Sequence, residues 1–273
     1  MFKENNIILF LLCILPILFY SLIISIYSPQ QSIKPKTSFN YLYSGLLSIT
    51  ILQFISFVFP HLHDNFFQET VKNFKIKDET FSIIRPTLNT LLLFTFVQIA
   101  LMEELSKWLA LKCVDIVRGK RKKNLDHPYA IIFYSCLVSA GFAIVENIQY
   151  ASSALQGALG HETPEKVLII RAMSSVIVHM TCGIFMGYYI ALSKGSKPAK
   201  KILYNSIGIF IATFMHGIYD FNWLKPGSEK DYYDFFNSLP IHMSSLAIIC
   251  FCLSITFMMA WHLKHINHEI KPQ

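Results

Sequence analysis

The stretch Leu101–Leu111, LMEELSKWLAL, puts two carboxylates and one ammonium inside a long apolar segment that begins near Thr87. On insertion scales a charge at the centre of a bilayer costs about 2.5–3.5 kcal/mol, so a membrane helix carries such residues only where they face protein or a wet cavity. Lys107 follows Glu103 by four residues and Glu104 by three, so either acid reaches it on one helical face. The stretch is therefore a candidate site.

The composition of the whole chain is that of a polytopic membrane protein. Hydrophobic residues make up 53% of the 273 residues and charged residues 15%, against roughly 25% charged in soluble domains. We therefore expect an all-α helix bundle in the lipid bilayer, with residues 1–273 as one integral membrane domain. The net charge of +7 comes from basic residues in the short connections between apolar runs, where it favours membrane orientation over a nucleic-acid partner.

Apolar runs of roughly 20 residues, the length that spans a bilayer, predict seven transmembrane helices. The connections that hold more Lys and Arg should be cytoplasmic, which predicts an external N-terminus and a cytoplasmic C-terminus. The run RGKRKK at 118–123 is the firmest signal. The first apolar run, 7–27, is too long for a signal peptide, so we expect it to be a membrane anchor. The expected spans are 7–27, 40–60, 87–112, 129–153, 167–192, 201–222 and 240–262.

Three further spans carry ionisable groups at middle depth. The fourth contains GFAIVENIQY (141–150), in which small residues on the face of Ser135, Ser139 and Ala143 lead to Glu146 and Tyr150. The fifth contains HMTCGIFMG, which aligns a histidine with two glycines, and the sixth contains HGIYD. A carboxylate one turn from an imidazole fixes its tautomer. Adjacent helices can bring these groups into one cavity, and the expected catalytic core spans approximately 87–222.

Structural explanations compete with functional ones at several positions. Lys107 and a histidine from another helix would be enough to neutralise Glu103 and Glu104. A lone histidine such as His179 is often a packing residue. Tyr150 and Asp220 are expected near the outer interface, where solvation explains them. Arg171 is expected to extend its charge to that interface from the outer end of its span.

Four motifs in order, EELSK (103–107), GFAIVENIQY (141–150), HMTCG (179–183) and HGIYD (216–220), resemble the PrsW intramembrane proteases. That family is distantly similar to the CAAX prenyl endopeptidases and the bacteriocin-processing membrane proteases. The resemblance covers roughly 91–221. It implies proteolysis of single-span membrane proteins, such as anti-sigma factors, in the bacterial cytoplasmic (inner) membrane.

Peptide hydrolysis needs an activated water, a proton donor for the leaving amine and a group that stabilises the oxyanion. We expect Glu103, helped by Glu104, to activate the water, with Lys107 holding the acid pair and no cofactor. The remaining catalytic candidates are Glu146, His179 and His216, of which the histidines orient the water and stabilise the oxyanion. The supporting candidates are Lys107, Asn147, Tyr150 and Asp220, and Asn147 is a further oxyanion donor.

Two alternatives remain open. The same histidines and carboxylates are a ligand set for Zn²⁺, although the chain contains no HExxH motif. A proton-coupled transporter would also use Glu and His in adjacent spans as a relay, but the sequence shows neither inverted repeats nor paired broken helices.

Overall fold

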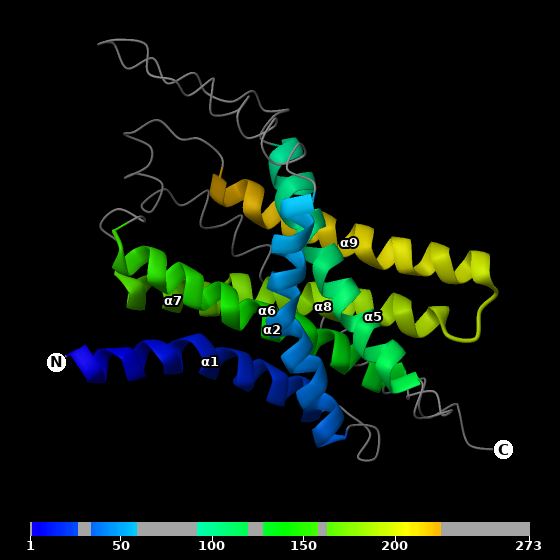
Figure 1. The fold of residues 1–273 in the computed structure, drawn as a ribbon, viewed down its shortest axis with the longest axis horizontal. Coiled ribbons are helices and arrows are strands. Elements are labelled where there is room, and N and C mark those ends of the chain that lie inside the picture. Colours follow the sequence, from blue (N-terminus) through cyan, green and yellow to red (C-terminus); the bar gives the residue numbers. More distant parts are fainter. Residues whose placement is uncertain (1, 27–33, 59–91, 120–127, 158–162, 225–273) are drawn as a thin grey trace, which may run out of the picture.

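A computed structural model describes residues 2–26, 34–58, 92–119, 128–157 and 163–224, and every regular element in these ranges is helical (Figure 1). The expected all-α class is therefore confirmed for the described chain. In chain order the elements are α1 (Phe2–Ile26), α2 (Pro35–Val58), the π-helix η1 (Phe94–Leu101), α5 (Met102–Gly119), α6 (Pro128–Leu155), α7 (Pro164–Met173), α8 (Ser175–Ser193) and α9 (Pro198–Leu224).

Four segments of the described chain are long and apolar enough to cross a membrane: Pro35–Val58, Pro128–Leu155, Pro164–Ser193 and Pro198–Phe221. They match the second, fourth, fifth and sixth expected spans. A shorter apolar run, Ile7–Leu22, lies in α1. The expected third span is one continuous helical stretch through η1 and α5 from Phe94 onward. The expected seventh span, 240–262, lies outside the described residues, so the count of seven and the orientation stay predictions.

Proline residues mark the start of several helices. Helices α2, α6, α7 and α9 each begin at a proline, which is suited to the first helical position because its missing N–H would have no helical partner there. The side chain of Thr163 also caps α7, accepting a hydrogen bond from the backbone N–H of Lys166. The expected spans begin at 40, 129, 167 and 201, so each of these helices starts before its expected span, at its proline.

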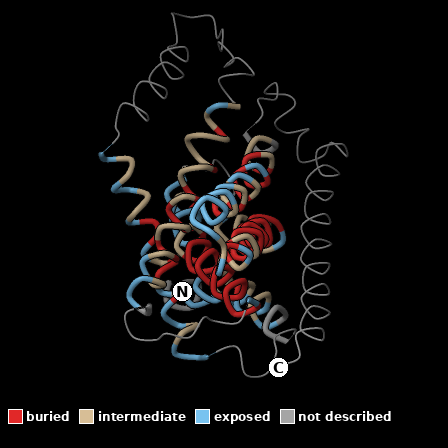
Figure 2. Tube along the Cα trace, turned by 90° about the vertical axis from the view of Figure 1, so that its right-hand side faces the viewer, coloured by how far each residue is buried: buried red, intermediate tan, exposed pale blue. Residues whose placement is uncertain are grey.

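Helix α6 lies at the centre of the described bundle. Every residue from Tyr129 to Ile144 is buried, because α2 and α8 pack along α6 and both α1 and α7 contact it. Helix α9 runs beside α8 and also contacts η1 (Figure 1). The buried residues gather in the middle of the bundle and the exposed ones face outward (Figure 2). A charged residue on an inner face is therefore shielded from lipid.

Small residues let α6 approach its neighbours closely. A Cβ atom on Gly183 would lie 2.6 Å from Ser139 Oγ, and one on Gly187 would lie 2.7 Å from the Cα of Ile132. The small-residue face of α6 thus packs on the glycine face of α8, as is typical of membrane helices. Because Glu146 and His179 lie at the same end of these two faces, the packing brings them together.

Candidate active site

The acid pair lies at the first turn of α5, immediately after η1. A single stretch of π-helix inside a membrane helix often marks a functional site. The side chain of Glu104 is fully buried, and only 12% of the side chain of Glu103 is exposed. Both acids therefore point into the bundle, as the sequence predicts.

Glu104 is held firmly by two partners. Its Oε1 accepts a hydrogen bond from Lys107 Nζ at 2.7 Å and lies 2.9 Å from Nδ1 of His216 on α9. Lys107 Nζ is in turn 3.0 Å from Nδ1 of His179 and 4.1 Å from the centroid of the Phe142 ring. Glu104 and Lys107 thus tie α5 to α8 and α9.

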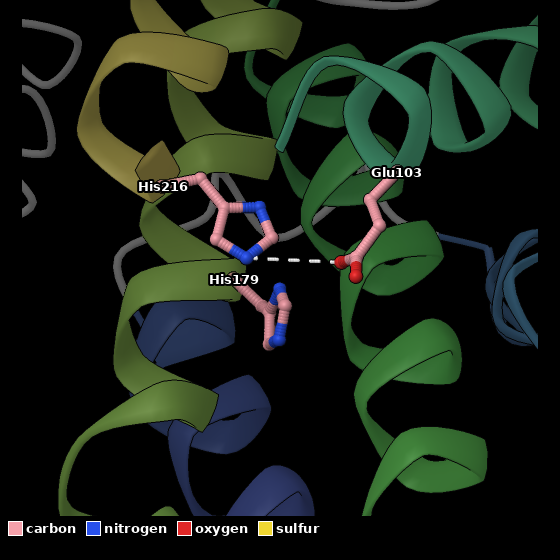
Figure 3. A group of neighbouring side chains, drawn as sticks. All are labelled: Glu103, His179 and His216. Carbon is pink, nitrogen blue, oxygen red and sulfur yellow. Dashed lines mark ion pairs between the residues drawn. The ribbon is translucent and has the colours of Figure 1, made fainter. Parts of the chain in front are cut away.

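Glu103 is held more loosely. Its Oε2 lies 3.7 Å from Lys107 Nζ and 3.7 Å from Nε2 of His216. That oxygen is buried and accepts no hydrogen bond from any residue that the structure describes. Glu103, His179 and His216 come from three helices and point toward one another (Figure 3). Oε2 of Glu104 is also buried without a hydrogen bond from the described residues, so Glu103 differs in that its ion-pair contacts lie at 3.7 Å, whereas Oε1 of Glu104 has two contacts below 3 Å.

His179 is bound to a second carboxylate, on α6. Its Nε2 lies 2.6 Å from Oε2 of Glu146, and the same oxygen accepts a hydrogen bond from Nη2 of Arg171 on α7 at 2.7 Å. Arg171 Nε donates to Oδ1 of Asn147 at 2.8 Å. The guanidinium is buried, so the expected extension of Arg171 to the interface is wrong. Its partners lie on a different helix, and spacing within one span cannot reveal them.

These partners show which ring nitrogens carry a hydrogen. A carboxylate only accepts, so the nitrogen that faces it carries the hydrogen: Nε2 in His179, opposite Glu146, and Nδ1 in His216, opposite Glu104. Nε2 of His216 also faces carboxylates, Asp220 at 3.3 Å and Glu103 at 3.7 Å, so they favour a hydrogen on this nitrogen as well. In His179 the lone pair of Nδ1 accepts from Lys107.

The supporting candidates lie at different distances from this centre. Asp220 Oδ2 is 3.3 Å from Nε2 of His216, which places Asp220 at the centre itself. The Tyr150 ring lies under the guanidinium of Arg171, 3.9 Å from Cζ to the centroid. The amide of Asn147 donates from Nδ2 to the carbonyl of Cys13 on α1 at 3.5 Å. Asp220 is therefore closer to the reacting groups than the interface explanation supposed.

The donor set also suits a metal ion. One ligand atom each from Glu103, His179 and His216 lies within 4.8 Å of the others. Two imidazole nitrogens and one carboxylate oxygen are a usual catalytic zinc set, with the fourth position left for water. Both histidines donate their other N–H to a carboxylate, which is the usual arrangement around a ligating imidazole. The buried, unpartnered Oε2 of Glu103 also fits the role of a metal ligand. The residues present therefore fit a zinc ion.

The family comparison agrees with the motifs. The model of the PrsW family intramembrane metalloproteases matches residues 46–258. The chain belongs to the PrsW family. No solved structure matches it significantly.

Three curated PrsW proteases are similar to part of the chain. The PrsW protease of Geobacillus kaustophilus is 34% identical over 135 residues, which cover 50% of this chain and 53% of that protein. That of Bacillus subtilis is 27% identical over 136 residues, 48% of this chain and 56% of that protein. That of Clostridioides difficile is 33% identical over 133 residues, which cover 48% of this chain and 52% of that protein. The chain thus matches about half the length of these PrsW relatives.

Together with the apolar helices, the PrsW family makes this an integral membrane protein. Arg171, like Asp220, is an ionisable group of the described centre that sequence reasoning placed near the interface. Its signal was available, because a membrane-embedded arginine near a predicted buried glutamate is more often paired than free.

Proposed function

We propose that this protein is a membrane-embedded peptidase that hydrolyses peptide bonds of single-span membrane proteins, with Glu103, His179 and His216 at its reacting centre. The observation that carries the proposal is the buried Oε2 of Glu103, which lies 3.7 Å from Nε2 of His216 and accepts no hydrogen bond from the described residues. A carboxylate with a free oxygen beside an oriented imidazole is the pairing that general acid–base hydrolysis needs.

In the metal-free form Glu103 takes a proton from the attacking water and delivers it to the leaving amine. Nε2 of His216, 3.7 Å from Oε2 of Glu103, orients that water, and His179, whose Nδ1 accepts from Lys107, borders the same space. The N–H at Nε2 of His216 donates to the oxyanion as it forms, which needs no further proton. Glu104 holds the ring of His216 and Lys107 holds both acids in place. Asn147 contacts Arg171 and α1, so its role as an oxyanion donor stays a prediction.

In the metal-dependent form Glu103, His179 and His216 would hold the ion. A zinc ion supplies a Lewis acid for the scissile carbonyl and makes a bound water acidic. Binding requires that Lys107 release Nδ1 of His179, which it contacts at 3.0 Å. The family description favours this form. Metal analysis of the purified protein, with activity before and after exhaustive chelation, separates the two forms.

The location of the site supports the proposed substrate class. Its carboxylates and histidines lie between the helices α5, α8 and α9 of an integral membrane protein (Figure 3), so a protein with a transmembrane segment reaches it more readily than a soluble one. We place the protein in the bacterial cytoplasmic membrane and name anti-sigma factors as the first substrates to test. The family match gives no support to the transporter alternative.

The test is co-expression of single-span reporters, including anti-sigma factors of the same genome, with wild type or with a Glu103→Ala, Glu104→Ala double variant. We expect cleavage with wild type only, at equal expression of both proteins. Equal cleavage with both would show that a host enzyme acts or that the acid pair is structural, and either result would overturn the proposal.

A further inference from the structure

Arg171 is a buried arginine with a full set of partners. Only 10% of its side chain is exposed, its guanidinium donates to Glu146 and Asn147, and the ring of Tyr150 covers one face. An arginine in a membrane helix is expensive to bury. None of its described partners is Glu103 or either histidine, so its effect on the reacting centre has to pass through Glu146.

We infer that Arg171 is a positioning residue, which holds the carboxylate of Glu146 so that His179 keeps its Nε2 bound and its Nδ1 directed to the reacting centre. The inference rests on the proposed function. It adds an Arg171–Glu146–His179 chain to the residues that serve the reaction.

The geometry of one oxygen supports the inference. Arg171 Nη2 and His179 Nε2 both approach Oε2 of Glu146, at 2.7 and 2.6 Å. A carboxylate held by His179 alone would be able to rotate, and the imidazole would be able to follow it. With a charged donor on the same oxygen, the position of Oε2 is fixed from two sides. Charge-assisted bonds of this kind are about twice as strong as neutral ones.

The backbone break between Arg171 and His179 gives the Arg171–Glu146–His179 chain a structural role. Helices α7 and α8 are interrupted at Ser174, whose φ of −137° and ψ of −79° are not helical. Arg171 lies before the interruption and His179 after it. Ser174 Oγ donates to the carbonyl of Ile170 at 2.7 Å and accepts from Tyr219 on α9 at 2.9 Å. The regular helix does not set the position of His179 relative to α7, so Glu146 joins the two segments.

The guanidinium suits this role better than an ammonium would. Its Nε and Nη2 contact Asn147 and Glu146, which are consecutive residues of α6. A planar fork that meets two acceptors at once orients both of them, whereas a lysine offers a point charge on a flexible stem. A lysine at position 171 would keep the charge beside Glu146 but lose the second contact.

The competing explanation is that Arg171 only fastens α7 to α6. It predicts that loss of Arg171 lowers stability and leaves each folded molecule fully active. The positioning role predicts a lower kcat for each folded molecule, because the imidazole is no longer held in place.

The experiment measures kcat and KM for cleavage of a reporter, at equal amounts of folded protein. The variants are Arg171→Gln, Arg171→Lys, Glu146→Gln and a paired variant that carries both Arg171→Gln and Glu146→Gln. We expect Arg171→Gln to lower kcat about 10- to 100-fold, the range for partners of site histidines, with little change in KM. Arg171→Lys should be intermediate. The paired variant should be about as active as Glu146→Gln alone, because residues that act in one chain are not additive.

The control is Lys166→Gln, which removes a cation from the exposed side of α7 and should retain wild-type kcat. Two results would overturn the inference. One is a loss of kcat in the paired variant that equals the product of the losses in the two single variants, and the other is wild-type kcat in Arg171→Gln.

A second readout does not depend on cleavage. In the ¹⁵N spectrum of histidine-labelled protein, the signals that His179→Gln removes belong to His179. We expect an Nε2-protonated ring in wild type and a mixture of tautomers in Arg171→Gln. If the His179 tautomer in Arg171→Gln is the same as in wild type, the inference is overturned and the proposed function is not. If wild type shows the expected tautomers but cleaves no reporter, the proposed function is overturned and the inference about the position of His179 is not.

Discussion

At the scale of single residues, the two acids of EELSK are chemically alike and structurally different. Glu104 is fully buried, and its Oε1 contacts Lys107 at 2.7 Å and His216 at 2.9 Å, whereas Glu103 contacts the same two residues only at 3.7 Å. Only the environment distinguishes them. We therefore propose that Glu104 holds the site together and that Glu103 takes part in the reaction.

This difference predicts different effects of the two glutamine substitutions. Glu103→Gln should lower kcat about 10²- to 10⁴-fold, as expected for loss of a general base, with little loss of stability, because no strong contact is broken. Glu104→Gln should also lower the free energy of unfolding, since breaking a buried ion pair costs about 3–5 kcal/mol. Cleavage rates and thermal unfolding in detergent measure both effects. Full activity in both single variants would contradict the assignment.

The sequence predicted most residues of this centre because charges are rare in a bilayer and each one stands out. It identified Glu103, Glu104, Lys107, Glu146, His179 and His216, and the structure brings these together. It did not predict which acid is held by Lys107 and His216, because that depends on contacts among α5, α8 and α9. It misplaced Arg171 for the same reason, since Glu146 lies on a different helix.

At the scale of helices, the sequence predicted four of the spans because apolar length is a local signal. It did not predict the interruption at Ser174 or the π-helix η1. Residues Met173–Ser175 contain neither Gly nor Pro, and the interruption is stabilised by the contact between Ser174 and Tyr219 on α9. Residues Phe94–Leu101 form an apolar stretch with no feature that separates a π-helix from an α-helix.

The crossing of α2 and α6 gives a prediction at this scale. A Cβ on Gly141 would lie 2.2 Å from the carbonyl oxygen of Leu42, which is backbone and cannot move aside. Gly141→Ala should therefore lower the free energy of unfolding by about 1–3 kcal/mol, the usual effect of overpacking. Thermal unfolding of purified protein measures it.

The control for this prediction is Gly208→Ala in α9. Its nearest neighbour would be the side-chain Cβ of Tyr189, at 3.1 Å, so a smaller loss is expected. Equal stability of Gly141→Ala and wild type would show that α2 does not approach α6 as closely as described.

At the scale of the whole molecule, helices distant in sequence supply one centre. Helix α5 contributes the acid pair, α6 contributes Glu146, α8 contributes His179 and α9 contributes His216. Helix α6 is buried between its neighbours and holds the others at fixed distances. The bundle therefore provides a polar interior in which a carboxylate and two histidines are kept away from lipid, and this is the condition that a membrane peptidase requires.

The most direct measurement of this claim uses purified protein in liposomes that contain one single-span reporter and no other protein. Wild type and Glu103→Gln are compared at equal amounts of folded protein, and mass spectrometry identifies the new termini. We expect wild type to produce two fragments cut within or next to the transmembrane segment, and Glu103→Gln to produce almost none. Equal fragment yields from both would contradict the assignment of the reaction to this centre.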